Sequence, residues 1–112
     1  MTPVTIHVTG GIAAYKAVSL LRLFQKNGDD VRVAMTESAT KFVTPATFEA
    51  LTKQPVLTDL WSPAQKAKIA HIELADWTEL AIVVPATANT IAKMAGGIAD
   101  NAVSSTLLAT DA

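Results

Sequence analysis

The stretch VTIHVTGGIAAYK, Val4 to Lys16, decides the fold class of this chain. Its first residues alternate between apolar and polar, as in a β-strand; two adjacent glycines follow, and the apolar residues after them recur at helical spacing. A glycine pair between a strand and a helix permits a sharp turn and lets another group approach the main chain closely. The free N–H groups at the start of the helix point into the same space, so we expect an anionic group to bind there.

The alternation of strand and helix continues along the whole sequence. Strands are predicted at 4–8, 31–35, 56–61 and 80–84, and the last is a continuous apolar run typical of parallel strands buried on both faces. Helices are predicted at 13–26, after Thr36 or Ser38, after Thr44-Pro45, at 91–95 and at 100–109, whereas 62–79 is expected to be loop with short helical turns. This order indicates an α/β fold with a parallel sheet, which binds ligands at the carboxyl ends of its strands.

Three loops follow predicted strands and precede predicted helices: 9–12, 36–38 and 85–90. Each is short and rich in small, hydroxyl-bearing or amide-bearing residues, which suits a ligand with polar groups. The first loop lacks both the G-x-G-x-x-G and the P-loop pattern, so its glycines are also explained by packing in a tight turn. Thr87 and Asn89 in the third loop are equally explained as helix caps. The residues by themselves leave the binding and the structural interpretations open.

The composition limits the classes of partner. The chain has 112 residues, of which half are apolar and 17% are charged, so we expect one domain with a sizeable core. A net charge of -1 provides no basic surface for nucleic acid or an anionic membrane. We expect neither a signal peptide nor a membrane span, and hence a cytoplasmic protein. Without cysteine and with two histidines, a metal site is not expected.

The two histidines differ in context. His7 lies in the middle of the first predicted strand, and we expect a neutral ring, central in the sheet, whose nitrogens are hydrogen-bonded. His71 lies in AHIELADW, before the buried strand at 80–84. An imidazole acts as acid or base near neutrality, so His71 is a candidate catalytic group, although a structural role is equally open.

Four motifs occur in order along the sequence: TGGIAAYK, VAMTESATKFVTP, HIELADW and VVPATANTIAKMAGGIADN. With them the chain, from about Thr5 to Leu108, resembles the N-terminal part of the homo-oligomeric flavin-containing cysteine decarboxylases, in particular the phosphopantothenoylcysteine decarboxylases of coenzyme A biosynthesis. The resemblance implies a Rossmann-like, three-layer flavoprotein with a mainly parallel sheet. It also implies FMN as the cofactor and a homotrimer or a multiple of trimers.

The resemblance further implies a reaction and the residues that carry it. The reaction is FMN-dependent decarboxylation of 4'-phosphopantothenoylcysteine to 4'-phosphopantetheine, in which oxidation of the thiol provides the electron sink. His71 matches the active-site histidine of the family, and we expect it to act as a base or to position the carboxylate and thiol. The residues that match the flavin-binding loops are Gly10, Gly11, Ile12, Thr36, Glu37, Ser38, Thr87, Ala88, Asn89 and Thr90. Many relatives have serine where this chain has Gly11.

The end of the sequence departs from the family pattern. Relatives continue beyond the position of Ala112 into a further strand, a P-x-M-N motif that contacts substrate and a flap with a cysteine. We therefore expect residues 1–112 to form a single flavoprotein domain that is truncated at its C-terminal end. Two alternative functions stay open: decarboxylation of the C-terminal cysteine of a peptide, and a non-catalytic module for flavin binding or subunit interaction.

Overall fold

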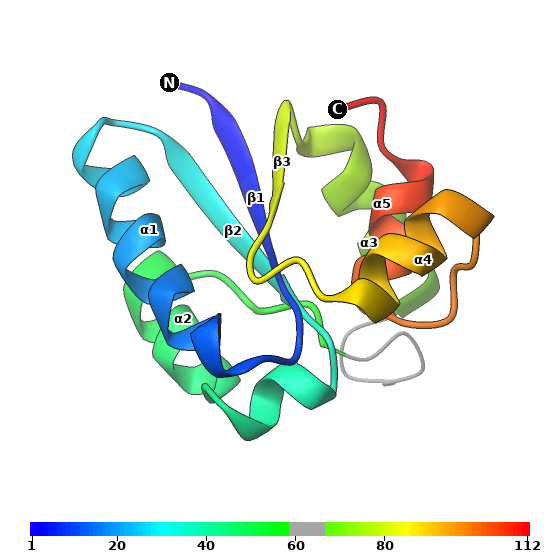
Figure 1. Cartoon of the computed structure of the whole chain (residues 1–112). Coiled ribbons are helices and arrows are strands. Elements are labelled where there is room, and N and C mark those ends of the chain that lie inside the picture. Colours follow the sequence, from blue (N-terminus) through cyan, green and yellow to red (C-terminus); the bar gives the residue numbers. More distant parts are fainter. Residues whose placement is uncertain (59–66) are drawn as a thin grey trace.

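The computed structural model describes residues 1–58 and 67–112. Its centre is a sheet of three parallel strands in the order β2-β1-β3, formed by β1 (Pro3–Val8), β2 (Asp30–Met35) and β3 (Leu80–Val83). Helical segments connect the strands (Figure 1). The predicted α/β fold with a parallel sheet is therefore confirmed.

Helices cover both faces of this sheet and complete three layers (Figure 1). Two short 3₁₀ turns follow β1 and β2. The helical elements are η1 (Ile12–Tyr15), α1 (Lys16–Lys26), η2 (Ser38–Lys41), α2 (Pro45–Thr52), α3 (Ala67–Trp77), α4 (Ala88–Gly96) and α5 (Ala102–Ala109). Helices α1 and α2 pack on one face, while α3 and α5 pack together on the other and α4 contacts α5.

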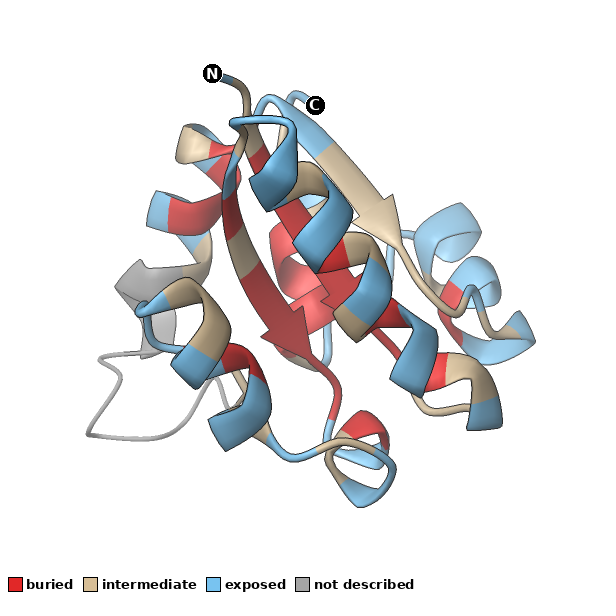
Figure 2. Cartoon of the chain, turned by 90° about the vertical axis from the view of Figure 1, so that its left-hand side faces the viewer, coloured by how far each residue is buried: buried red, intermediate tan, exposed pale blue. Residues whose placement is uncertain are grey.

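The sheet has a buried apolar core on each of its faces. Val4, Ile6 and Val8 are fully buried on one face, where they pack with Leu21 of α1 and Phe48 of α2. The opposite face has a smaller core of Ala34, Leu57, Leu74, Ala102 and Val103. Most of β1 and β2 is buried, whereas β3 is of intermediate exposure (Figure 2). The carboxyl ends of the strands are thereby held by a rigid centre.

The strand predicted at 56–61 is wrong in its described part, 56–58. Leu57 forms an isolated parallel bridge with Ala34 there. Its carbonyl accepts from Met35 N at 2.9 Å and its N–H donates to Val33 O at 3.1 Å. The preceding Pro55 has no N–H with which to extend the ladder toward the N-terminus. Residues 59–61 lie outside the described residues.

The loop predicted at 62–79 is also wrong over most of its length, because α3 occupies Ala67–Trp77. Residues 62–66 lie outside the described part of the chain. The sequence AKIAHIELADW contains strong helix formers and neither glycine nor proline, which explains the helix. Leu74 and Ala75 are buried, but apolar residues also occupy other sides of the helix. The sequence therefore lacks the single apolar stripe by which an amphipathic helix is predicted.

His7 is fully buried in the central strand, as predicted, but the predicted hydrogen bonds are absent. Within the described residues, neither Nδ1 nor Nε2 has a hydrogen-bond partner. The register places Ala34 and Val83 beside His7, and neither offers a polar side chain. Burial lowers the pKa of His7 from 6.5 to about 4, so the ring is neutral at pH 7.

Candidate functional site

The three loops that follow the strands meet at one cavity of about 430 Å³, which we name the loop cavity. They lie at the same edge of the sheet because the strands are parallel. The described residues that line the loop cavity are Gly10, Thr36, Glu37, Ser38, Thr87, Asn89, Thr90, Lys93, Asp100 and Asn101. The structure therefore brings together residues of all three loops and adds three residues from further along the chain.

The glycine pair of the first loop lies against both other loops. A Cβ placed on Gly10 would lie 2.5 Å from Ser38 Cβ, closer than real side chains approach, and one on Gly11 would lie 3.0 Å from Pro85 Cγ. Gly11 has a φ of -170°, which any residue adopts, so contact and not backbone conformation favours glycine there. The packing interpretation of the pair is thus supported: bare backbone lets the second and third loops close on the first.

The threonines of the second and third loops make local hydrogen bonds. Thr36 Oγ1 accepts from Ala39 N at 3.1 Å, at the start of η2. Thr87 is the N-cap of α4: its Oγ1 accepts from Thr90 N at 3.2 Å and donates to Thr90 Oγ1 at 3.1 Å. Capping therefore explains these residue types, and the same side chains line the loop cavity.

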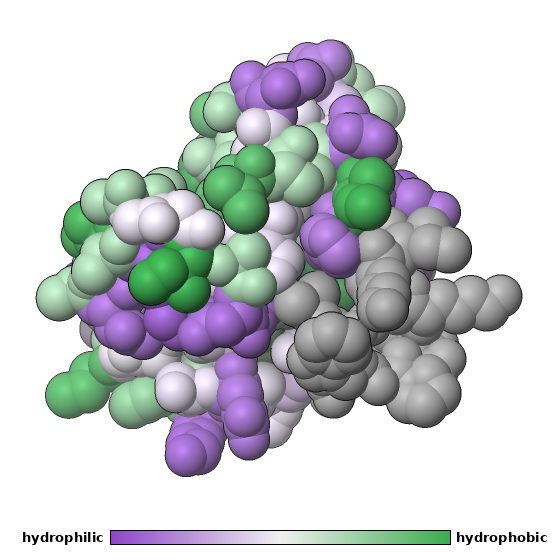
Figure 3. Space-filling model, turned by 90° about the vertical axis from the view of Figure 1, so that its right-hand side faces the viewer, coloured by the Kyte–Doolittle hydropathy of each residue, from purple (hydrophilic) through white to green (hydrophobic). Residues whose placement is uncertain are grey.

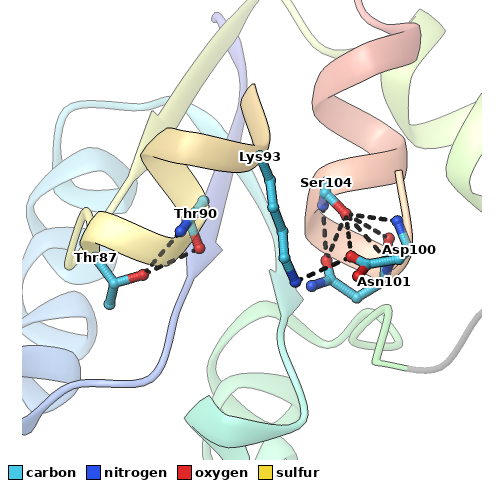
Figure 4. A network of polar contacts seen from close by, with 6 residues as sticks. All are labelled: Thr87, Thr90, Lys93, Asp100, Asn101 and Ser104. Carbon is cyan, nitrogen blue, oxygen red and sulfur yellow. Dashed lines mark hydrogen bonds and ion pairs between the residues drawn. The ribbon is translucent and has the colours of Figure 1, made fainter. Parts of the chain in front are cut away.

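Lys93, Asp100 and Asn101 complete the cavity and were not predicted from the sequence. Lys93 Nζ lies 3.0 Å from Asp100 Oδ1 (Figure 4). Asn101 caps α5 through a capping box, in which its Oδ1 accepts from Ser104 N at 2.8 Å and Ser104 Oγ accepts from Asn101 N at 3.1 Å. Two signals were available: Lys93 lies three residues after Thr90, hence on the same helical face, and N-A-V-S has the spacing of a capping box.

The lining of the loop cavity is mixed in charge. Lys93 is its cationic side chain, and Glu37 and Asp100 are its anionic side chains. The hydrogen bond from Lys93 lowers the pKa of Asp100, so this carboxyl group is ionised at neutral pH. The remaining side chains are hydroxyls and amides, which both donate and accept hydrogen bonds. The cavity is therefore suited to a ligand with several polar groups of different kinds.

Four of the residues predicted for the site do not line the loop cavity: Gly11, Ile12, Ala88 and His71. Ile12 is 82% exposed at the start of η1, and Ala88 is exposed at the start of α4. His71 is partly buried on α3. Three of these four residues belong to the loops or helix starts beside the cavity, but they are not part of its lining.

In the ranges 1–58 and 67–112, no group of three or more histidine, cysteine, aspartate and glutamate side chains is placed to hold a metal ion. No helix of these two ranges is both long and apolar enough to cross a membrane.

Two curated proteins illustrate the relatives of this sequence. The coenzyme A biosynthesis bifunctional proteins CoaBC of Bacillus subtilis (strain 168) and Escherichia coli (strain K12) are 50% and 48% identical to it over 109 residues. Each match covers 97% of this chain and 27% of the relative. The chain therefore spans about a quarter of the length of the curated relatives it matches.

Two solved structures illustrate the fold that this chain shares. The FMN-dependent cysteine decarboxylase TvaF from thioviridamide biosynthesis matches with a TM-score of 0.90 and 28% identity, over 99% of this chain and 68% of that chain. MrsD from Bacillus sp. HIL-Y85/54728 matches with a TM-score of 0.84 and 26% identity, over 98% of this chain and 63% of that chain.

These likenesses confirm the predicted Rossmann-like, three-layer flavoprotein fold. A family model described as Flavoprotein matches residues 1–112. The four sequence motifs, the fold and this match agree, and the chain belongs to the Flavoprotein family.

Proposed function

We propose that this chain binds FMN in the loop cavity and is the flavin-binding part of a phosphopantothenoylcysteine decarboxylase, which forms 4'-phosphopantetheine from 4'-phosphopantothenoylcysteine in coenzyme A biosynthesis. The observation that carries the proposal is the meeting of three loops at one cavity in a Flavoprotein-family chain. The 50% and 48% identity to two CoaBC proteins supports the coenzyme A branch. TvaF, described as FMN-dependent, supports the cofactor.

The residues of the loop cavity fit the chemistry of FMN. The hydroxyl groups of Thr36, Ser38 and Thr87 are suited to the oxygens of a ribityl chain and a phosphate. Free N–H groups at the start of α4 favour an anion on the same side. Asn89 and Asn101 carry amides that donate and accept, as the polar edge of a flavin ring requires. We assign these residues to cofactor binding on this basis.

Loss of carbon dioxide from the cysteine carboxylate requires prior two-electron oxidation of the cysteine thiol. FMN, when bound, would supply the electron acceptor for that oxidation. We assign proton handling at the substrate to His71. Thr78, just after α3, bonds to Thr5 near the start of β1, so α3 ends at the amino edge of the sheet. From there α3 extends back toward the opposite edge, where the loop cavity lies (Figure 1).

The role of His71 is tested by a His71→Asn variant. We expect the variant to keep bound FMN and to lose carbon dioxide release, because an amide does not exchange protons near neutral pH. Flavin absorbance and carbon dioxide release from phosphopantothenoylcysteine are the measurements. Glu73→Gln is the matched control, since Glu73 is exposed on the same helix. Full decarboxylation by His71→Asn would refute the assignment.

A second candidate function is decarboxylation of a C-terminal peptidyl cysteine. The TM-score of 0.90 to TvaF supports it, and the lower identity of 28%, against 50% and 48% for the CoaBC proteins, favours the first candidate. Incubating the chain with FMN and each substrate in turn separates the two. Flavin binding with carbon dioxide release from neither substrate would indicate a non-catalytic flavin-binding module.

We propose a cytoplasmic homotrimer as the functional assembly, as the family resemblance implies. Apolar side chains on α4, on α5 and in the connection between them are about half exposed, namely Ile91, Met94, Ile98 and Leu108. Figure 3 shows the face formed by α3, α4 and α5, where apolar side chains lie among polar ones. A subunit contact that covers them would stabilise the assembly. The mass in solution, measured by light scattering, tests this proposal.

A further inference from the structure

The ion pair of Lys93 and Asp100 lies at the boundary of two cavities. Beside the loop cavity, a second cavity of about 170 Å³ lies between α4 and α5, and we name it the helix cavity. Its described lining is mostly apolar and consists of Lys93, Met94, Gly97, Ile98, Ser104, Leu107 and Leu108. Lys93 lines both cavities. A lysine suits this boundary because its aliphatic stem packs on apolar groups while its ammonium group stays among polar ones.

The pair adds little to the stability of the fold. The Asp100 side chain is 57% exposed, and ion pairs between exposed side chains contribute little to the free energy of unfolding. The capping box of Asn101 and Ser104 also holds the first turn of α5, so loss of the ion pair leaves the helix folded. The effect of Lys93 is therefore local and concerns where the Asp100 carboxylate lies.

Asp100 is held from two sides. Its backbone N–H donates to Ser104 Oγ at 3.1 Å, and its carboxylate accepts from Lys93 Nζ at 3.0 Å (Figure 4). Asp100 and Asn101 both line the loop cavity, together with residues of the second and third loops. The two residues therefore form one wall of the cavity, and both Lys93 and Ser104 contact the Asp100 carboxylate of that wall.

The charge of this wall indicates which part of a ligand it faces. The Lys93 charge is compensated by Asp100, and Glu37 adds a further negative charge to the cavity. Because the two charges of the pair compensate each other, the wall offers a phosphate dianion no net attraction, whereas N–H groups of a heterocyclic ring donate hydrogen bonds to a carboxylate.

We propose that Lys93 is a positioning residue, which fixes the Asp100–Asn101 turn through its ion pair and so raises affinity for the ring of a bound flavin. This inference rests on the proposed FMN binding. A phosphate ligand would contact the phosphate group of FMN directly. The proposed role of Lys93 acts instead through Asp100 and affects affinity for the flavin ring.

The first test compares FMN with riboflavin, which has the ring but no phosphate. Dissociation constants from flavin fluorescence are measured for the variants Lys93→Met, Lys93→Arg, Asp100→Asn and Lys93→Met with Asp100→Asn. We expect each of Lys93→Met and Asp100→Asn to weaken both ligands roughly tenfold, and the double variant no more than either single variant, since the same pair is broken. Lys93→Arg restores binding to within about threefold of the wild type because guanidinium also pairs with carboxylate. Lys26→Met, an exposed lysine of α1, is the matched control.

The second test needs no ligand. Amide hydrogen exchange at Asp100 and Asn101 is expected to be several-fold faster in Lys93→Met, while the melting temperature changes by at most about 2 °C. A loss of affinity confined to FMN would overturn the proposal in favour of a phosphate contact, and unchanged exchange at both amides would overturn it as well. If the wild-type chain binds no flavin, the proposed function fails, and the exchange rates alone decide whether Lys93 fixes the turn.

Discussion

Gly10 and Gly11 hold the first loop against the loops that follow the two neighbouring strands. The need for glycine comes from the contacts of the two positions with Ser38 and Pro85, which lie far from them in the sequence. The position of the pair between a strand and a helix could be predicted, because it is a local pattern. The residues that contact the glycine pair could not be predicted, because these contacts depend on how the three loops are brought together.

Gly10→Ala should destabilise the fold and weaken FMN binding together. Its Cβ would lie 2.5 Å from Ser38 Cβ, so the second loop must shift, at a cost of about 1–3 kcal/mol. Urea unfolding and an FMN titration are the measurements. Gly96→Ala is the control, because its Cβ meets Ile98 at an ordinary 3.8 Å. Equal unfolding free energies and equal FMN affinities of the two variants would show that the close contact of the first two loops affects neither stability nor binding.

His7 should make the fold sensitive to acid. Its pKa is about 4 in the folded chain and 6.5 in the unfolded chain, so protonation favours unfolding. The free energy of unfolding is therefore unaffected by this group above pH 6.5 and decreases as the pH falls toward 4. The full effect of protonating His7 in the unfolded chain is a loss of about 3 kcal/mol. Unfolding free energies measured between pH 7 and pH 4 test this expectation.

The matching variant is His7→Leu, which removes the two unpartnered ring nitrogens. We expect it to abolish this acid-dependent loss and to stabilise the fold at pH 7 by roughly 1 kcal/mol. His71→Asn, with His7 intact, should keep the loss. An unchanged pH profile in His7→Leu would show that the loss has another origin. The central position of His7 followed from its strand, but its missing partners depend on register and could not be predicted.

At the scale of elements, helix caps connect the fold with the loop cavity. Thr87 and Thr44 both occupy the N-cap position of a helix, but only Thr87 makes the side-chain cap hydrogen bond. Both cap positions were predicted from Thr followed by a helical pattern. The helix α3 was not predicted, because its apolar residues do not form one stripe and its packing against α5 is a tertiary contact.

Thr87→Ala should destabilise the chain by about 1 kcal/mol, because α4 loses the acceptor for Thr90 N. Thr44→Ala should cost only a few tenths of a kcal/mol, since no cap hydrogen bond is lost at α2. Thermal unfolding of both variants provides the comparison. An FMN titration should also show weaker binding for Thr87→Ala alone, given its place in the loop cavity. Indistinguishable melting temperatures would contradict this account of capping.

At the scale of the whole molecule, the parallel sheet explains why distant segments form one cavity. The loops at its carboxyl edge could be predicted because the parallel direction of the strands follows from the alternation of strands and helices. Lys93, Asp100 and Asn101 were missed because they come from the side of α4 and the start of α5, not from strand ends. Their contribution depends on the packing of α4 against α5.

The central claim is that FMN binds in the loop cavity, and chemical-shift mapping tests it most directly. Backbone ¹H–¹⁵N spectra of the labelled chain are recorded with increasing FMN. The account predicts saturable shifts that concentrate at Gly10, at 36–38, at 87–90 and at 100–101, with small changes at Leu107 and Leu108 in the helix cavity. Shifts centred on the helix cavity, or no shifts at millimolar FMN in a folded chain, would contradict it.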